Sequence, residues 1–149
     1  MGNLKLTSSA FEDGGEIPLE CGYKNGNKRP PLTVSGIPEG TKSLALIMDD
    51  PDAMGAVGKV WVHWVIWNFT CFADAKPDFS RPTKQGMTDF GEVGYGGPAP
   101  PDKRHTYIFK LYALATDLDL PDKSTKADVE KAMEGHIIEQ ATLTGTYAP

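Results

Sequence analysis

The sequence predicts a mainly β protein, a largely antiparallel β-sandwich with one late helix and long surface loops. First, 12 prolines and 16 glycines fall between short apolar runs, a distribution typical of many turns and short strands. Second, the runs KVWVHWVIWNF and TYIFKLYAL are apolar on both alternating faces. Such strands are central and covered on both sides, and we expect a second sheet to supply the cover.

The elements follow from these runs and their Gly, Pro, Asn or Asp boundaries. Thr125 and Asp128 have the spacing of a capping box and begin the one convincing helix. Its apolar stripe would be Val129, Ala132, Met133, Ile137 and Ala141, with Gly135 costing about 1 kcal/mol of helix propensity. Residues 71–97 are expected to form a long irregular surface loop. The expected strands are 4–8, 31–34, 44–50, 60–69 and 105–116, with a weaker one at 142–147.

Length and charge restrict the function classes. With 149 residues, the chain is expected to form a single domain over 1–149. Its net charge of −5 argues against nucleic acid or an anionic membrane as the main partner. We see no secretory signal and no apolar run long enough to be a transmembrane segment. Cys21 and Cys71 lack paired spacing, so a reduced, cytoplasmic protein is expected.

Polar residues gather where one predicted strand ends and the next begins, in LIMDDPDAMGAVGKVWVHW. If the two strands are antiparallel neighbours, Asp50, Asp52 and His63 share one rim of the sheet. Strict alternation places His63 on the face of Trp61, Val65, Trp67 and Phe69. We expect the aspartates to hold His63 and to favour its protonated form. A core histidine beside a strand-terminating turn is the alternative interpretation, and the sequence leaves it open.

A second cluster follows in GYGGPAPPDKRHTY. Glycines at 94, 96 and 97 allow backbone N–H groups to approach a ligand, and three prolines stiffen the loop. His105 and Tyr107 are two residues apart and share a face of the next strand. Together these groups would form a nest for a small anion such as phosphate. A stiff turn followed by a core tyrosine remains the alternative.

In this order the motifs DPDA with WVHW, then GYGGPAPP with HTY, resemble the phosphatidylethanolamine-binding proteins, also called the Raf kinase inhibitor-like family. The resemblance covers roughly residues 4–147 and is strongest to the short bacterial and archaeal YbhB/YbcL type. It implies a Greek-key β-sandwich with an anion-binding pocket at one end, where similar proteins bind phosphate-like groups, including phosphorylethanolamine heads. The residues that it assigns to the pocket are Asp50, Asp52, Trp61, His63, Gly97, Pro98, His105 and Tyr107.

Two positions depart from the family pattern. Met54 stands where proline usually follows DPDA, and Thr106 replaces the arginine of the usual His-Arg-Tyr. A pocket without that arginine is expected to prefer a smaller or less charged ligand, unless Lys103 or Arg104 compensates. The short segment after Tyr147 leaves no room for the terminal helix of longer eukaryotic relatives, so their lipid specificity is not assumed.

Four functions are compatible with these residues. The favoured one is a non-enzymatic binding or regulatory protein, without cofactor, that recognises phosphorylated small molecules, phospholipid head groups or phosphorylated protein segments, as a monomer or homodimer. The second is an inhibitor of a protease or kinase, acting through the 71–97 loop. A hydrolase with an Asp–His general base is the third, although no Gly-x-Ser-x-Gly elbow is present. A metal site made of Asp50, Asp52, His63 and His105 is the fourth.

Overall fold

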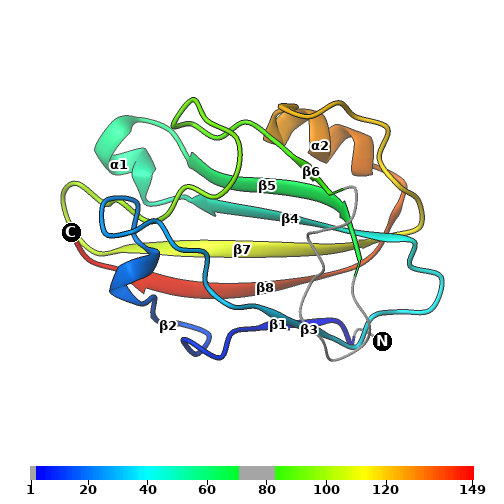
Figure 1. Cartoon of the computed structure of the whole chain (residues 1–149), viewed down its shortest axis with the longest axis horizontal. Helices are drawn as coiled ribbons and strands as arrows, with labels where there is room; N and C mark the ends of the chain where they lie inside the picture. Colours follow the sequence, from blue (N-terminus) through cyan, green and yellow to red (C-terminus); the bar gives the residue numbers. More distant parts are fainter. Residues whose placement is uncertain (1–2, 71–82) are drawn as a thin grey trace.

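The computed structural model describes residues 3–70 and 83–149. Within them, a six-stranded sheet has the order β2-β8-β7-β4-β5-β6, and β1 and β3 form a separate two-stranded sheet (Figure 1). All paired strands are antiparallel except β2 and β8. The elements are β1 Lys5–Thr7, β2 Gly15–Glu16, a 3-10 turn Leu19–Cys21, β3 Thr33–Ser35, β4 Ser43–Asp50, α1 Ala53–Val57, β5 Trp61–Phe69, β6 Lys84–Gln85, β7 His105–Leu114, α2 Lys126–Met133 and β8 Ile137–Tyr147. The predicted fold class is confirmed.

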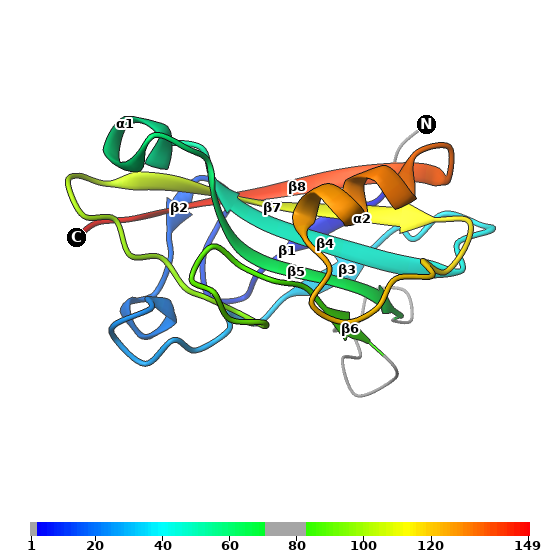
Figure 2. The same ribbon diagram turned by 90° about the horizontal axis from the view of Figure 1, so that it is seen from above.

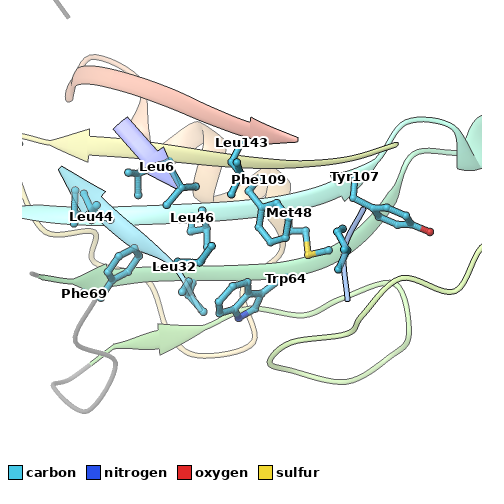
Figure 3. Packing of buried hydrophobic residues seen from close by; sticks show 14 of the residues in the cluster. Leu6, Leu32, Leu44, Leu46, Met48, Trp64, Phe69, Tyr107, Phe109 and Leu143 are labelled. Carbon is cyan, nitrogen blue, oxygen red and sulfur yellow. The ribbon is translucent and has the colours of Figure 1, made fainter. Parts of the chain in front are cut away.

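The main apolar core lies between the large sheet and the β1–β3 sheet (Figure 3). Leu6 and Val34 of the small sheet pack here against large-sheet residues such as Leu46 and Phe109, all of them buried. Apolar burial of this kind stabilises by about 25 cal/mol per Å². It also fixes which face of each central strand points inward, and so which side chains reach the end of the sheet.

The opposite face of the large sheet is covered by α2 (Figure 2). Val129 and Met133 of this helix are buried against Ile47, Val65 and Trp67. The expectation that a second sheet covers the central strands is therefore right for one face and wrong for the other. An amphipathic helix can bury the same apolar surface without needing edge partners of its own.

Helix α2 begins as predicted and ends earlier. Asp128 N donates to Thr125 Oγ1 (3.2 Å) and Thr125 N donates to Asp128 Oδ2 (3.0 Å), which completes the capping box. The predicted continuation through Ile137 to Ala141 is wrong, because residues 137–147 form β8 and pair with β7 along its whole length. Gly135, with φ +79°, marks the reversal between the two elements.

The same correction applies to His136 and Glu139, whose three-residue spacing would place both on one face of the longer helix predicted from the apolar stripe. Glu139 lies in β8, and its Oε2 accepts a hydrogen bond from Leu4 N at 2.6 Å. This bond joins the start of the chain to the large sheet. His136 and Glu139 are therefore not one helical turn apart, and they do not form a pair of ligands on a helix face.

Two irregularities in β5 change the faces of its side chains. Met48 is opposite Trp64 and Asp49 is opposite Val62, so His63 is an extra residue in a β-bulge. Val65 and Trp67 consequently pack beneath α2, while Phe69 lies in the other core. The strict alternation predicted for these residues is wrong, because each bulge shifts the side-chain period by one residue.

Part of the predicted 71–97 loop, including Cys71, falls on residues 71–82 and lies outside the described residues. Its remainder contains β6 and an antiparallel bridge between Met87 and Val93. No helix among the residues described has the length and apolar character needed to cross a membrane.

Candidate functional site

A cavity of about 190 Å³ opens at the end of the sheet where β4 ends and β5 and β7 begin. Helix α1 lies at this end of the molecule (Figures 1 and 2). Asp50 is paired with Trp61 in the β4–β5 ladder, as expected for consecutive antiparallel strands. The lining residues are Asp50, Ala53, Ala56, Val57, Trp61, His63, Phe90, Ala99, Pro101, His105 and Tyr107.

Five of the eight predicted site residues are among these lining residues: Asp50, Trp61, His63, His105 and Tyr107. The other three, Asp52, Gly97 and Pro98, lie outside the cavity lining. Asp52 Oδ2 instead accepts a hydrogen bond from Thr106 N at 2.8 Å, which ties the start of α1 to β7. Its carboxylate therefore orders the rim of the cavity and does not line it.

His105 is held between two carboxylates. Its Nδ1 is 2.6 Å from Asp50 Oδ2 and its Nε2 is 2.7 Å from Asp102 Oδ1. The His105 side chain is fully buried, Asp50 is 4% exposed and Asp102 is 43% exposed. A carboxylate accepts hydrogen bonds, so both ring nitrogens carry a hydrogen when both bonds are made, and the ring is then an imidazolium.

The electrostatics of His105 agree with this geometry. Burial lowers its pKa, but the hydrogen bonds to Asp50 and Asp102 and their charges outweigh burial, and the net pKa is raised. Asp102 shows the reciprocal effect: desolvation raises its pKa, and the bond to His105 leads the contributions that outweigh it, so the net pKa is lowered. The buried cation of the site is therefore His105.

His63 is in a different state from the one predicted. Its Nδ1 is 2.7 Å from the carbonyl oxygen of Gly96, which can only accept, so Nδ1 carries the hydrogen. Burial lowers the pKa of His63, and the Gly96 bond and the charge of Asp50 only partly oppose it. The prediction that the aspartates hold His63 and favour its charged form is wrong: Asp50 binds His105, and His63 is neutral.

Two polar atoms of the lining are buried without a hydrogen-bond partner among the described residues. They are Asp50 Oδ1 and the Tyr107 hydroxyl. Figure 3 shows Tyr107 at one end of the apolar cluster, with its hydroxyl directed away from the neighbouring apolar side chains. Burial, then the charge of Asp50, raise the pKa of Tyr107, and a hydrogen-bonding contribution from Asp50 adds to the rise while one from the Ala99 backbone opposes it. The phenol therefore keeps its proton and faces Asp50, at a geometry that does not complete a hydrogen bond. Buried polar atoms are normally paired, so these two are the atoms of the lining that most need a partner.

The loop that contains Gly96 and Gly97 forms the cavity wall through contacts other than those predicted. Gly96 N donates to the His63 carbonyl (2.8 Å) and Gly97 N donates to Asn27 Oδ1 (2.6 Å), so neither is available to a ligand. A Cβ at Gly97 would collide with the Cys21 carbonyl oxygen. These two glycines therefore allow the loop to approach protein backbone and side chains, and we had expected them to approach an anion.

Sequence reasoning missed the apolar part of the wall and one carboxylate. Phe90 makes edge contacts with His63 (5.4 Å between ring centroids) and Trp61 (5.6 Å) and stacks on Tyr23 (4.0 Å). Ala53, Ala56 and Val57 come from α1, whose five residues include a glycine and carry little helical signal. The position of Asp102, three residues before His105, was the signal in the sequence that could have indicated this carboxylate.

The structure also shows where Met54 and Thr106, the two departures from the family pattern, lie. Met54 is exposed on α1, and the backbone N–H of Thr106 binds Asp52. Arg104 Nη1 is 2.8 Å from Glu16 Oε2 on the exposed side, so it is paired outside the cavity. The described residues contain no group of three or more His, Cys, Asp or Glu side chains placed to hold a metal ion. Asp50, Asp52, His63 and His105 are therefore not placed together as a ligand set in the described structure.

This fold and site define a β-sheet protein with a small polar-ended pocket, and the comparisons give its family. The sequence model described as phosphatidylethanolamine-binding protein matches residues 7–148. A UPF0098 protein of Methanothermobacter thermautotrophicus is 46% identical, over 97% of this chain and 98% of its own length. The chain belongs to the phosphatidylethanolamine-binding protein family.

Two solved structures have the same fold over almost their whole length. The phosphatidylethanolamine-binding protein homologue CT736 of Chlamydia trachomatis has a TM-score of 0.87 and 37% identity, covering 97% of this chain and 96% of its own. YbcL of E. coli has a TM-score of 0.87 and 32% identity, covering 98% of each chain. The predicted resemblance to the YbhB/YbcL type is confirmed.

Proposed function

We propose that the pocket binds a small phosphate-like anion and that the protein is a non-enzymatic binding protein with a regulatory role. The observation that carries this proposal is a pair of buried polar atoms in residues of one cavity lining, Asp50 Oδ1 and the Tyr107 hydroxyl, which have no hydrogen-bond partner in the part of the chain that the structure describes. A bound ligand would satisfy both atoms. A ligand with oxygen atoms and a hydrogen to donate fits them better than an apolar molecule does.

One cation and one hydrogen-bond donor of the lining also support a ligand with charged oxygen atoms. His105 is a buried imidazolium at the cavity wall, and the Tyr107 hydroxyl can donate to a ligand oxygen. Apolar residues such as Phe90 and Val57 form much of the remaining lining and reduce screening by water. Hydrogen bonds to a charged ligand are stronger in such surroundings, because water competes less for them.

The size of the cavity favours a head group. About 190 Å³ is smaller than the roughly 300–1,000 Å³ typical of drug-sized ligands. The family takes its name from proteins that bind phosphatidylethanolamine, and the ligand of this chain would then be a phosphorylated small molecule, a lipid head group or a phosphorylated side chain. We also propose that the protein is cytoplasmic and that nucleic acid is not its partner.

The rival functions have less support in the structure. The inhibitor hypothesis depends on the loop whose residues 71–82 are outside the described part of the chain. The hydrolase hypothesis needs an Asp–His base directed at water, but both nitrogens of His105 face carboxylates and His63 Nδ1 faces a carbonyl. Absence of enzymatic activity stays a prediction.

Thermal unfolding with increasing phosphate or phosphorylethanolamine near pH 6 tests the proposal. A ligand at a hundred times its dissociation constant adds about 2.7 kcal/mol to the free energy of unfolding. For a protein of this size that corresponds to roughly 5–10 °C in Tm. His63→Ala should lose most of the shift, because it removes a ring of the cavity wall, and His136→Ala on the exposed surface should keep it.

Stabilisation of the wild type that is lost in His63→Ala and kept in His136→Ala supports a working anion pocket. Equal stabilisation of all three proteins would place the anion elsewhere. No stabilisation of the wild type up to high millimolar phosphate would refute the pocket as the functional site and favour the inhibitor hypothesis.

A further inference from the structure

We propose that the pocket selects a phosphate group that carries a proton, the monoanion of a phosphate monoester, whose P–OH group donates to Asp50 Oδ1. Sulfate and phosphodiesters, which have no such hydrogen near neutral pH, would be rejected. This inference rests on the proposed function and defines its ligand class more narrowly.

The argument begins with the two oxygens of Asp50. Oδ2 accepts from His105 Nδ1 at 2.6 Å, and Oδ1 is buried without a partner among the described residues, although Asp50 lines the cavity. A carboxylate oxygen can only accept a hydrogen bond. A fully deprotonated anion in the cavity would set its own acceptor oxygens against this one. A ligand that brings a hydrogen would pair with it.

His63 adds a second acceptor. Its Nδ1–H is used by the Gly96 carbonyl, so in the neutral ring Nε2 has a lone pair and no hydrogen. Burial in the cavity wall disfavours a second proton on this ring. The lining thus offers Asp50 Oδ1 and a neutral histidine as acceptors, and the Tyr107 hydroxyl as a donor. A P–OH with two or three further oxygens is complementary to this set.

The charged groups around the cavity give the same preference. Asp49 faces the other side of the sheet, where Lys126 Nζ (2.7 Å) and Lys110 Nζ (3.1 Å) bind its carboxylate. Lys59 Nζ pairs with Asp89 and lies 5.9 Å from the ring centroid of Trp61, outside the cavity lining. Arg104 pairs with Glu16 on exposed surface. The charged or titratable groups at the cavity, by element, are Asp50 of β4, Asp52 at the start of α1, His63 of β5, Asp102 of the loop, and His105 and Tyr107 of β7.

The only cation in that set is His105, and it is already shared by two carboxylates. A dianion would therefore meet a wall whose positive charge is more than balanced by Asp50, Asp52 and Asp102. A monoanion brings less repulsion, and it also brings the hydrogen that Asp50 Oδ1 needs. Phosphate monoesters lose that proton with a second pKa of about 6, so both forms are accessible near neutral pH.

An ammonium group on the ligand could donate to Asp50 Oδ1 in place of P–OH, and a suitable set of ligands separates the two. Methyl phosphate has the P–OH and no ammonium, and dimethyl phosphate has neither. Glycerophosphoethanolamine is a diester with an ammonium. Sulfate has no hydrogen to donate and matches the shape of phosphate.

Isothermal titration calorimetry of the wild type with these four ligands at about pH 5.5 and pH 7.5 tests the inference. The monoanion fraction of methyl phosphate falls about 25-fold between these pH values for a pKa of about 6, and its affinity should fall accordingly. At the lower pH, sulfate and dimethyl phosphate should bind at least about tenfold more weakly than methyl phosphate. Their own pH dependence reports the titration of the pocket itself.

Asp50→Asn supplies the matched variant, because its amide can donate to a ligand oxygen where the carboxylate can only accept. Sulfate should then gain at least about tenfold relative to methyl phosphate. Asp117→Asn removes the same charge at an exposed site beyond the far end of β7 and should leave the selectivity unchanged. If Asp50→Asn does not fold, the four-ligand series on the wild type still decides.

Absence of methyl phosphate binding would refute the proposed function itself. Binding of methyl phosphate with sulfate equal to it, or with no pH dependence, would overturn the proton selectivity and leave the anion pocket standing. Binding of glycerophosphoethanolamine as strong as methyl phosphate, with dimethyl phosphate weak, would assign the donor to an ammonium group and overturn the inference too.

Discussion

Replacement of Asp50 by alanine should destabilise the protein most where His105 is charged. The change removes the 2.6 Å partner of a fully buried imidazolium and leaves Asp102, which is 43% exposed, as the remaining one. Loss of one partner of a buried ion pair costs about 3–5 kcal/mol, and the surviving bond to Asp102 argues for the lower end. For a chain of this length, about 3 kcal/mol corresponds to roughly 6–12 °C in Tm.

The sign of the pH dependence follows from the raised pKa of His105. Because the folded state holds this proton more tightly than the unfolded chain, the stabilisation is complete below the ordinary histidine pKa of about 6.5. It is lost as pH rises through the higher folded-state pKa. The Asp50→Ala penalty should therefore be largest near pH 5.5. By pH 9 it should fall to about 1.5 kcal/mol, the lower end of the range for one hydrogen bond to a charged group.

Urea unfolding of the wild type and Asp50→Ala at several pH values measures this difference. Asp102→Asn is the graded comparison: it removes the charge at the exposed end, so its penalty should be clearly smaller than that of Asp50→Ala. A penalty for Asp50→Ala that is the same at pH 5.5 and pH 9 would refute the argument, because it would mean that His105 is neutral in the folded state.

Three further predictions concern the supports of the site. Because the pKa of His63 is lowered in the folded state, the unfolded chain binds a proton at this ring first, and the wild type loses stability as pH falls below about 6.5. His63→Gln should remove this loss, and urea unfolding at about pH 5 and 7 checks it. Thr125→Ala should cost about 1 kcal/mol by calorimetry, through the lost N-cap of α2. Gly97→Ala should lower Tm by several degrees, since its Cβ would meet the Cys21 carbonyl; an unchanged Tm would contradict this close approach.

The sequence was sufficient to predict which polar residues meet at the cavity. Asp50, His63, His105 and Tyr107 were expected at one end of the sheet, because consecutive antiparallel strands bring the end of one beside the start of the next, and all four line the cavity. Such proximity needs only the strand boundaries and the pairing. The family motifs added Trp61 in the same way.

The pairing within the site could not be predicted, because it depends on one β-bulge. Strict alternation directed His63 toward the aspartates, but the extra residue opposite Met48 and Asp49 turns the ring toward the Gly96 carbonyl. A bulge has no dependable local signature when the flanking residues are all apolar. For the same reason the sequence could not show that Asp50 binds His105.

The predicted end of α2 was wrong for a different reason. Ile137 and Ala141 continue the spacing of Val129 and Met133 by coincidence, and a helical period cannot be told from a strand over so few residues. The long pairing of β8 with β7 then decides, because a full antiparallel ladder satisfies more backbone groups than two further helical turns at the surface. Tertiary context overrode the local pattern.

The two histidines at the cavity divide the electrostatic roles between them. His105 keeps its proton because Asp50 and Asp102 both accept from it, and this fixes one oxygen of Asp50 and leaves the other buried without a partner among the described residues. His63 stays neutral because burial lowers its pKa, and the bond from its Nδ1 to the Gly96 carbonyl only partly opposes this effect. A pocket with one fixed cation and two open acceptors is suited to an anion that supplies its own proton, and the stiff loop before His105 matters because it carries Asp102.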